Sequence, residues 1–569
     1  MLGNNEKSSQ GSSVMTNKPW AVNCIGSTIS LPIAPVVLED RSGMPDGTYP
    51  ISQEQLNASY NWKFSDWYPR CCMACSLNGL YPIHECRWHA AAIAVPEEIT
   101  SSCEEMELCG ETDCDKPRQR RKPNIGDLPD HVLITVFENI HRVELTRSIC
   151  LVCRRWNRLT QTPRLWREIR IVVCNEPSCL DSIRTFLYRV CRFIQKLCIY
   201  ILNCEPISEM DFINLFPPQM LAVTVLDIGF LCYFTVPVVQ FLITCFPNVE
   251  KLNVEGLKKV DEGAFKLMFS EGFTQLKELI LSHCESLTLQ DFDMLCRAAH
   301  PLSVLSIDGI LTLQSYAGLR LAESSMVSSL TRLYLDGEEM YDAAFGAITC
   351  CRNLELLSVS YCESATNLSL TYIKSLSKLK HLHLRKGKEF TEEGLKSFFE
   401  INNGNPSSAP IFPAKLRYLN LGECPGVNDV VVDLLTKSCP ELVSLCLVWC
   451  WSVTDIGFTH LVQRLSNLEF LDIRGMDCID GRALLKVPNL HLKKLRYLGA
   501  EQCPRIEDST LQILNLQKKD LIISNYHNYF ITFELCNGIA RFGERFDKQF
   551  EEAVSDVLSR HEGYCCMAL

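Results

Sequence analysis

The sequence predicts an α/β protein in which a short all-helical block is followed by a curved solenoid of about 12 strand–helix repeats. Two observations predict this fold class. From about residue 192 to about 517, leucine and other apolar residues recur with a period of mostly 24 to 29 residues, which is the length of one such repeat. Ahead of that array, residues 125–171 carry the three- and four-residue apolar spacing of helices.

Composition and charge limit the classes of function. Hydrophobic residues make up 47% of the 569 residues and charged residues 22%, which excludes disorder throughout the chain. With 56 Lys and Arg against 67 Asp and Glu, the net charge is −11. An acidic chain is a poor general ligand for nucleic acid, so we expect no nucleic-acid partner.

The 31 cysteines are expected to be reduced thiols. The first 20 residues are polar and do not resemble a signal peptide, which predicts a cytoplasmic protein. Residues 228–246 approach the length of a membrane span, but Pro237 and Gln240 interrupt them and they fall inside the repeat pattern. We therefore interpret them as buried core.

Residues 1–123 show no sustained periodicity and are expected to be a largely disordered extension with one Cys- and aromatic-rich island. The thiols and imidazoles from Cys72 to His89 could hold zinc, but their spacing fits no established pattern, and we predict no metal site. The basic run at residues 116–122 is interpreted as a soluble linker, with a nuclear localisation signal as the alternative.

Residues 124–170 form the helical block. Pro129 suits the start of a helix, because its missing N–H would be unpaired there in any case. One helix face is predicted from Val132 to Ile140 and a second from Ile149 to Leu159, before Pro163-Arg-Leu-Trp166. Three helices of this size bury little surface alone, so their apolar faces are expected to dock onto a partner.

The block resembles the F-box in Leu128-Pro129, Leu133, Phe137, Leu151-Val-Cys-Arg-Arg-Trp156 and Leu165-Trp166. It departs at His141-Arg-Val143, where the family usually ends its first helix with an apolar residue. The resemblance implies docking to a Skp-type adaptor and, through it, to the cullin and RING protein of a ubiquitin ligase. The adaptor-binding residues that it implies are Leu128, Pro129, Leu133, Phe137, Val152, Cys153, Trp156, Leu165 and Trp166. Arg154 and Arg155 are expected to form a solvated charged face.

The repeat array spans residues 171–519 and is typical of leucine-rich repeats. Copies of L-x-x-L-x-L start at Leu276, Leu354, Leu379, Leu416, Leu442 and Leu468, and weaker copies at Ile194, Val223, Val249, Leu302, Leu330 and Leu495. The one long step, from Leu379 to Leu416, contains residues 402–410, which predict an inserted loop.

Several units end in a cysteine, and helix-capping residues recur behind them. The cysteines are Cys284, Cys362, Cys424, Cys450 and Cys503, and a buried thiol acts as a small hydrophobe with a weak donor. Asn428-Asp429 and Thr454-Asp455 each place a capping side chain before an acid of the first helical turn. These units resemble the cysteine-containing repeat subclass, so residues 125–517 resemble the F-box/leucine-rich-repeat family.

The side chains that alternate with the buried strand residues are expected to line a concave face. Its later units carry aromatic, His and Arg residues, which are enriched where proteins bind proteins. The predicted substrate-binding residues are Tyr334, His381, His383, Arg385, Tyr418, Phe470, Arg474 and Tyr497. A solvated sheet face is the alternative for this surface, and Trp449 could belong to the core. His381 and His383 share a face but have no third ligand in view, so no metal is expected there.

Residues 520–569 are expected to form a capping helix and a tail. Phe542, Phe546, Phe550 and Val554 have helical spacing. The chain ends in Cys566-Met-Ala-Leu569, which has the C-a-a-X form of a geranylgeranylation signal, and Cys565 could carry a second lipid. The tail therefore predicts membrane association through a lipid.

The sequence shows none of the nucleophile, phosphate-loop or metalloprotease motifs of enzymes, so we expect no catalytic residue and no cofactor. Together with the F-box resemblance, it predicts a non-catalytic substrate-recognition subunit of an SCF-type ubiquitin ligase, which binds a protein substrate on the repeat arc. The alternative is a repeat scaffold that does not engage the ligase and is anchored at membranes by its lipid.

Overall fold

The computed structural model describes residues 125–543 except 141, 174–176, 202–206, 258, 271, 299, 401–411, 488–490 and 537–538, and of residues 143 and 532–543 only the backbone. All of these residues belong to one compact unit, Ala58–Leu569. The Cys- and His-rich island, the basic run, the loop at 402–410 and the lipidation candidates Cys565 and Cys566 lie outside the described residues.

The helical block lies at the start of the hydrophobic core that continues through the repeats. It comprises η2 (Ile125–Asp127), α4 (Asp130–Glu138), α5 (Arg142–Glu144), η3 (Leu145–Ile149), α6 (Cys150–Val152), α7 (Arg154–Leu159) and η4 (Pro163–Trp166). Leu133 and Phe137 of α4 are fully buried, and the Phe137 ring meets Trp156 edge-on at 5.2 Å. The extended backbone of Cys153 separates α6 from α7, and its thiol accepts the Trp156 N–H. The second predicted face, from Ile149 to Leu159, is therefore divided among η3, α6 and α7.

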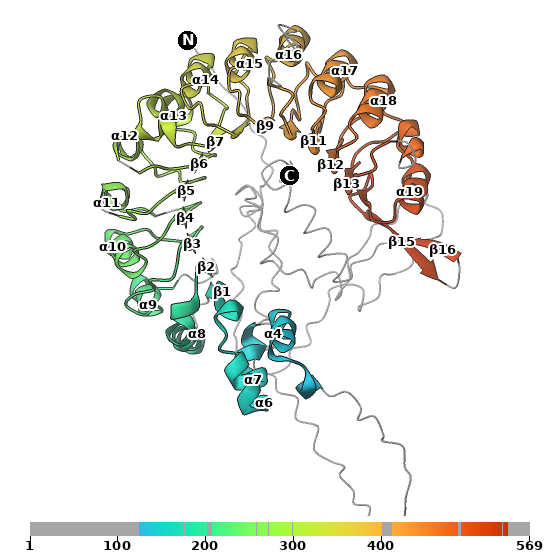
Figure 1. The fold of residues 1–569 in the computed structure, drawn as a ribbon. Coiled ribbons are helices and arrows are strands. Elements are labelled where there is room, and N and C mark those ends of the chain that lie inside the picture. Colours follow the sequence, from blue (N-terminus) through green and yellow to red (C-terminus); the bar gives the residue numbers. More distant parts are fainter. Residues whose placement is uncertain are drawn as a thin grey trace, which may run out of the picture. The chain divides into compact units, whose positions relative to one another are not determined.

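The repeat array is one sheet whose strands follow one another in sequence order. Figure 1 shows the strands along the inner side of an arc and the helices along its outer side. The strands are β1 (Glu168–Val173), β2 (Lys196–Ile201), β3 (Val225–Asp227), β4 (Lys251–Asn253), β5 (Glu278–Ile280), β6 (Val304–Ile307), β7 (Arg332–Asp336), β8 (Leu356–Ser360), β9 (His381–Leu384), β10 (Tyr418–Asn420), β11 (Ser444–Cys446), β12 (Phe470–Asp472), β13 (Tyr497–Gly499), β14 (Ile522–Ser524), β15 (Phe530–Cys536) and β16 (Ile539–Gly543).

Helices connect most of the successive strands, since parallel neighbours need a crossover between them. They are α8 (Pro177–Val190), η5 (Cys191–Phe193), α9 (Glu209–Asn214), α10 (Val236–Cys245), α11 (Ala264–Ser270), α12 (Leu289–Arg297), α13 (Gln314–Leu321), η6 (Ser325–Ser328), α14 (Asp342–Ile348), α15 (Asn367–Ile373), α16 (Glu392–Phe399), α17 (Asp429–Ser438), α18 (Asp455–Arg464), η7 (Arg482–Lys486) and α19 (Asp508–Gln517). The apolar stretch at 228–246 contains α10, whose Val238, Val239 and Leu242 are buried. Within the described ranges, no helix combines the length and apolar composition needed to span a bilayer.

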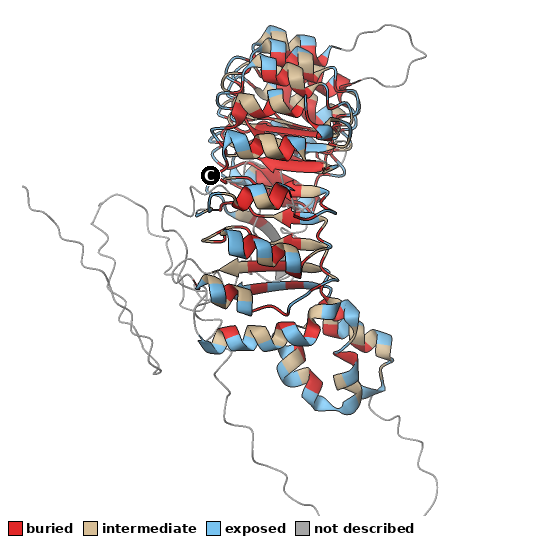
Figure 2. Cartoon of the chain, turned by 90° about the vertical axis from the view of Figure 1, so that its left-hand side faces the viewer, coloured by how far each residue is buried: buried red, intermediate tan, exposed pale blue. Residues whose placement is uncertain are grey.

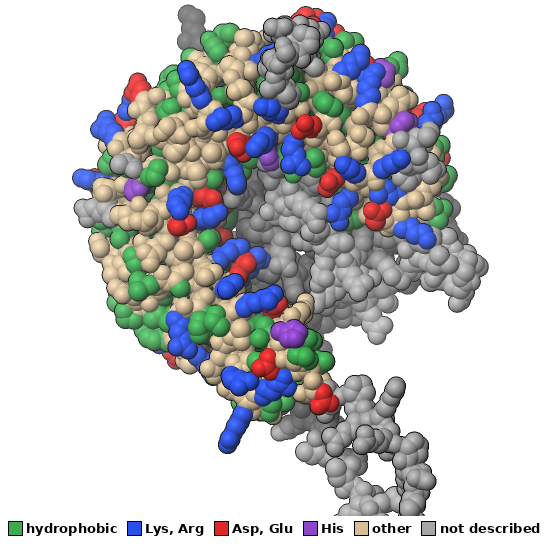
Figure 3. Space-filling view, in the orientation of Figure 1, with side chains coloured by type: hydrophobic (Ala, Val, Ile, Leu, Met, Phe, Trp, Pro, Cys, Tyr) green, Lys and Arg blue, Asp and Glu red, His purple; other side chains and the backbone are tan. Residues whose placement is uncertain are grey.

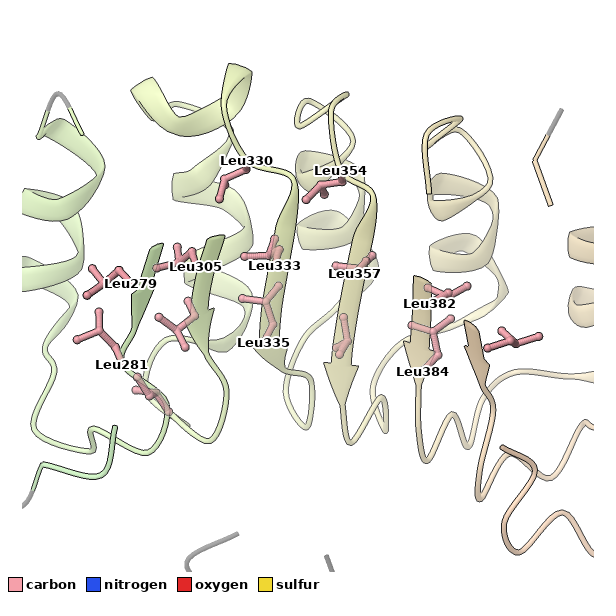
Figure 4. Close-up of a cluster of buried hydrophobic side chains, with 14 of the residues drawn as sticks. Leu279, Leu281, Leu305, Leu330, Leu333, Leu335, Leu354, Leu357, Leu382 and Leu384 are labelled. Carbon is pink, nitrogen blue, oxygen red and sulfur yellow. The ribbon is translucent and has the colours of Figure 1, made fainter. Parts of the chain in front are cut away.

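Each of the 12 predicted units contributes one strand, from β2 to β13, and the array adds β1 before them and β14 after them. The central leucines pair in register, as in Leu279↔Leu305↔Leu333↔Leu357↔Leu382. Figure 4 shows these leucines stacked in rows across neighbouring strands, and Figure 2 shows the resulting bands of buried residues. The inserted loop does not disturb the register, because Leu382 of β9 still pairs with Leu419 of β10.

A turn with a left-handed backbone follows most strands, at the fifth position after the first strand residue. We call these residues the turn ladder; they are Phe230, Gly256, His283, Gly309, Tyr361, Lys386, Glu423, Trp449, Gly475 and Gln502, with φ between 55° and 72°. A non-glycine residue in this conformation costs about 1 to 2 kcal/mol. Hydrogen bonds between repeats offset that cost, for example from the Trp449 N–H to the Arg474 carbonyl at 2.8 Å.

The repeat cysteines are buried beneath these turns. Cys284, Cys424, Cys450 and Cys503 are fully buried, and each thiol donates to a carbonyl of the preceding repeat at 3.1 to 3.3 Å. Burial raises the pKa of the Cys284 and Cys503 thiols to about 12, so both stay protonated. A small, neutral and weakly polar side chain is what this position requires.

The predicted helix caps are present, and they also join neighbouring repeats. Asn428 accepts the Val431 N–H at the start of α17. The carboxylate of Asp429 then reaches the next repeat, where it accepts the Thr454 N–H at 2.8 Å, the Thr454 hydroxyl at 2.6 Å and the Gly457 N–H at 3.0 Å. A Cβ on Gly457 would lie 2.4 Å from that carboxylate, so only glycine permits this approach.

The end of the array differs from the helix expected there. β15 reverses direction and pairs antiparallel with β14, and β16 pairs with β15. Phe542 lies in this hairpin opposite Phe533 and not in a helix; Phe546, Phe550 and Val554 lie outside the described residues. The physical reason is that β14 presents unpaired backbone groups along its edge, which a strand can satisfy and a helix cannot.

Replacing Asp429 by Ala removes three hydrogen bonds between α17 and the start of α18. We expect the free energy of opening α18 to fall by about 1 to 3 kcal/mol, because the caps of α18 lose a charged acceptor. Hydrogen exchange of the α18 amides measures this change, and Glu441→Ala, at an exposed acid of the same repeat, is the control. Equal α18 protection in both variants would contradict the capping role.

Candidate protein-docking surfaces

The residues implied in adaptor binding fall into two groups in the helical block. Leu133, Phe137, Leu165 and Trp166 are buried, with exposed fractions of 3% or less. The Trp166 indole N–H donates to the Thr160 carbonyl at 2.7 Å. These four side chains therefore hold the block together and cannot themselves reach a partner.

The remaining predicted residues lie at the surface. Val152 is 58% exposed, Cys153 and Pro129 are exposed, and Leu128 and Trp156 are half-buried. Leu151, which was not among the predicted docking residues, is 77% exposed, the largest value among the exposed large hydrophobic side chains of the described part of the chain. The signal that could have included it is its position in the sequence, directly before the predicted docking residue Val152.

Arg155 is not part of a solvated face, although its sequence context suggested one. Its guanidinium donates to the carbonyls of Gly126 and Leu128, both at 2.6 Å, and to the Asp130 carboxylate at 2.8 Å. The hydrogen bond from Arg155 holds the pKa of Asp130 below its usual value. Arg155 thus fastens the entry turn of α4 to α7, whereas Arg154 is exposed.

The predicted substrate-binding aromatics lie in one lateral row because the strands pair in register. His381 of β9 pairs with Tyr418 of β10, and Phe470 of β12 pairs with Tyr497 of β13. Their rings stack at 4.3 Å and 4.6 Å, respectively. We call these four residues the inner aromatic row. His381 and Tyr418 are half-buried, whereas Phe470 and Tyr497 are fully buried.

His381 acts in this row as an aromatic ring and not as a cation. Burial is the main cause that lowers the pKa of His381 to about 4, and Arg332, Arg417 and Lys380 lower it further. Its imidazole is therefore neutral at pH 7, which favours stacking on Tyr418. His383 and Tyr334 lie in the next row of the sheet, with Ser358 between them in the register.

Both predicted arginines are held in ion pairs. Arg474 lies against Asp472 at 2.8 Å and 3.7 Å from Glu501, and Arg385 donates to Glu423 at 2.6 Å. Burial and the nearby Asp472 raise the pKa of Glu501 to about 6, which Arg474 opposes. The arginines are thus fixed in orientation, and their charge is largely compensated before any partner arrives.

The strand rims carry charges of both signs. Lys251 pairs with Glu278, Lys277 with Glu250 and Lys380 with Glu355, at 2.7 to 3.0 Å between neighbouring repeats. Figure 3 shows Lys, Arg, Asp and Glu side chains interspersed along the rim. Such a surface suits a protein partner better than a polyanion. Among the residues that the structure describes, no three His, Cys, Asp or Glu side chains gather as metal ligands would.

Comparison with known protein families gives a match for the helical block. Residues 125–172 match the family model described as F-box-like, so the helical block is an F-box-like block. Among solved structures, similarity extends to a chain of the Rad7–Elc1 complex from yeast, with 17% identity over 69% of this chain and 92% of that chain and a TM-score of 0.46. An internalin (InlF) from Listeria monocytogenes matches with 18% identity over 64% of this chain and 94% of that one, at a TM-score of 0.33.

The Arg155→Ala variant should loosen the entry turn at residues 126–130, because three hydrogen bonds from α7 to that turn are lost. We expect faster hydrogen exchange of the α4 amides, with the repeat amides unchanged. Arg154→Ala is the matched control, since it removes an equal charge from the neighbouring position. Similar exchange in the two variants would show that Arg155 has no such fastening role.

Proposed function

We propose that this chain is the substrate-recognition subunit of an SCF-type ubiquitin ligase. The observation that carries the proposal is the F-box-like match at residues 125–172. The central apolar side chains of this block are buried, and its surface still presents Leu151 and Val152. Exposed apolar side chains side by side on a small helical block are typical of a docking surface. The partner expected there is a Skp-type adaptor, and through it a cullin and a RING protein.

In this proposal the chain itself performs no covalent chemistry. The F-box-like block attaches it to the ligase, and the repeat arc holds a protein substrate within reach of the ubiquitin-conjugating enzyme. The gain in rate comes from proximity, since a substrate lysine and the activated ubiquitin then meet within one complex.

The substrate surface that we propose is the half-buried part of the later repeats. Tyr334, His381, His383, Arg385 and Tyr418 are neither buried nor fully exposed. Rings stacked in pairs and arginines fixed by ion pairs lose little conformational freedom on binding, which favours affinity. Phe470 and Tyr497 lie farther along the array, buried in β12 and β13, and Arg474 follows β12.

The C-terminal sequence suggests where such a ligase would act. Cys566-Met-Ala-Leu569 has the C-a-a-X form, and Cys565 precedes it. A prenyl group on Cys566, with a second lipid on Cys565, would hold the complex at a membrane, because stable anchoring takes two signals.

The double variant Leu151→Glu, Val152→Glu tests adaptor docking without touching the core of the block. We expect adaptor and cullin to be lost from the complex, because two charges would be buried in an apolar interface. Co-purification of the full-length variant measures the loss. Leu311→Glu, at a position that is 61% exposed in the repeat array, is the matched control.

An undiminished yield of adaptor with the double variant, at normal thermal stability, would refute docking through this surface. The F-box-like sequence of the block would then not be sufficient evidence that the chain acts in a ubiquitin ligase.

The substrate surface is tested by Tyr418→Ala, which removes the stacking partner of His381. If Tyr418 is a hot spot, substrate affinity should fall by about 2 kcal/mol, or roughly 30-fold, while adaptor binding is unchanged. Proximity labelling in cells, with proteasome inhibition, compares this variant with Tyr188→Ala, an exposed tyrosine of α8. If both variants retain the same labelled proteins, the substrate does not bind at the inner aromatic row.

A further inference from the structure

The loops that follow β11 to β14 surround a pocket of about 680 Å³. Trp449, Trp451 and Tyr526 line it, together with the carboxylates of Asp477 and Glu501, and none of its ten lining residues is Lys or Arg. Trp449 and Trp451 meet edge-on at 6.1 Å, and Trp451 is 56% exposed. The wall of the pocket thus combines aromatic faces with negative charge.

The turn ladder also shows how the ring of Trp449 is packed. Earlier in the ladder, Tyr361 is followed by Lys386, whose ammonium lies 4.3 Å from the centre of the tyrosine ring. Trp449 is followed instead by Gly475, and a Cβ there would lie 2.8 Å from the indole. The next ladder residue thus supplies a cation to the ring of Tyr361, whereas the backbone of Gly475 packs directly against the indole of Trp449.

The carboxylates of the pocket carry charge that the described residues do not fully compensate. Asp477 is exposed and has no ion-pair partner among the described residues. Glu501 is 7% exposed and accepts the Ser524 hydroxyl with one oxygen, whereas its other oxygen has no hydrogen-bond donor. Arg474, 3.7 Å away, is shared between Glu501 and Asp472.

We propose that this pocket binds the guanidinium group of an arginine side chain from a protein partner. A guanidinium is planar and weakly hydrated, so it stacks on indole and phenol rings and donates to a carboxylate at the same time. A lysine ammonium is more strongly hydrated and lacks the planar face. The site lies in the turns beyond the strands and goes beyond the proposed ligase role, since it does not depend on the F-box-like block.

The experiment uses the full-length chain and three capped tripeptides with glycine at both ends: one with arginine in the centre, one with lysine and one with citrulline. Citrulline has the shape of arginine without its charge. Ligand-observed NMR titration should show that the arginine peptide binds at least about tenfold more tightly than the citrulline peptide, since one charge-assisted contact accounts for about 1.4 kcal/mol. The lysine peptide should bind more weakly than the arginine peptide.

Two variants locate the site. Trp451→Ala and Asp477→Asn change exposed side chains of the pocket, and each should weaken binding of the arginine peptide by about tenfold. Tyr341→Ala, at a 60% exposed tyrosine elsewhere, and Glu441→Gln, at an exposed acid, should leave it unchanged.

Several results would overturn the proposal: no binding of the arginine peptide, equal binding of the citrulline peptide, equal binding of the lysine peptide, or unchanged binding in both pocket variants. None of these results depends on the adaptor, so a failure here is distinct from a failure of the ligase role.

Discussion

The register of the parallel strands is the constraint on which the rest of this structure depends. Each central leucine lies opposite the central leucine of the next strand, from Leu252 of β4 to Leu498 of β13. A repeat cannot bury that leucine alone, so the stability of each unit comes from its neighbours. The same register determines the contacts of the turn ladder and of caps such as Asp429. It places equivalent residues of successive repeats, 25 to 30 positions apart along the chain, next to each other.

Because of this register, residues at equivalent positions of successive repeats lie side by side and form continuous surfaces. His381 and Tyr418 are 37 positions apart, with an inserted loop between them, yet their rings stack because β9 and β10 pair residue for residue. Trp449 and Gly475 meet for the same reason at the turns. The same register therefore places the residues of the inner aromatic row side by side in the strands. It also places the residues that line the pocket side by side in the turns that follow the strands.

The sequence was sufficient for the twelve strand positions, since each requires only local leucine spacing, and for the caps at Asn428 and Thr454. It did not predict β1 or the hairpin of β15 and β16, which lack that spacing and form because a neighbouring edge needs a partner. Nor did it separate Leu133 from Leu151, since both are apolar residues of short helices and only the packed block decides which one is buried. Arg385 pairs with Glu423, which is 38 positions away in the sequence. Arg474 pairs with Asp472 because the backbone turns after β12. The spacing of residues in the sequence reveals neither contact.

The reversal of direction at β15 has a consequence for self-assembly. A sheet made only of parallel repeats would end in an edge able to accept a further array of the same kind, and head-to-tail stacking of that sort builds an open filament. The antiparallel hairpin presents a different hydrogen-bonding pattern from that of a repeat strand. A second array of parallel repeats would therefore meet, at this end of the described sheet, an edge unlike that of a repeat strand.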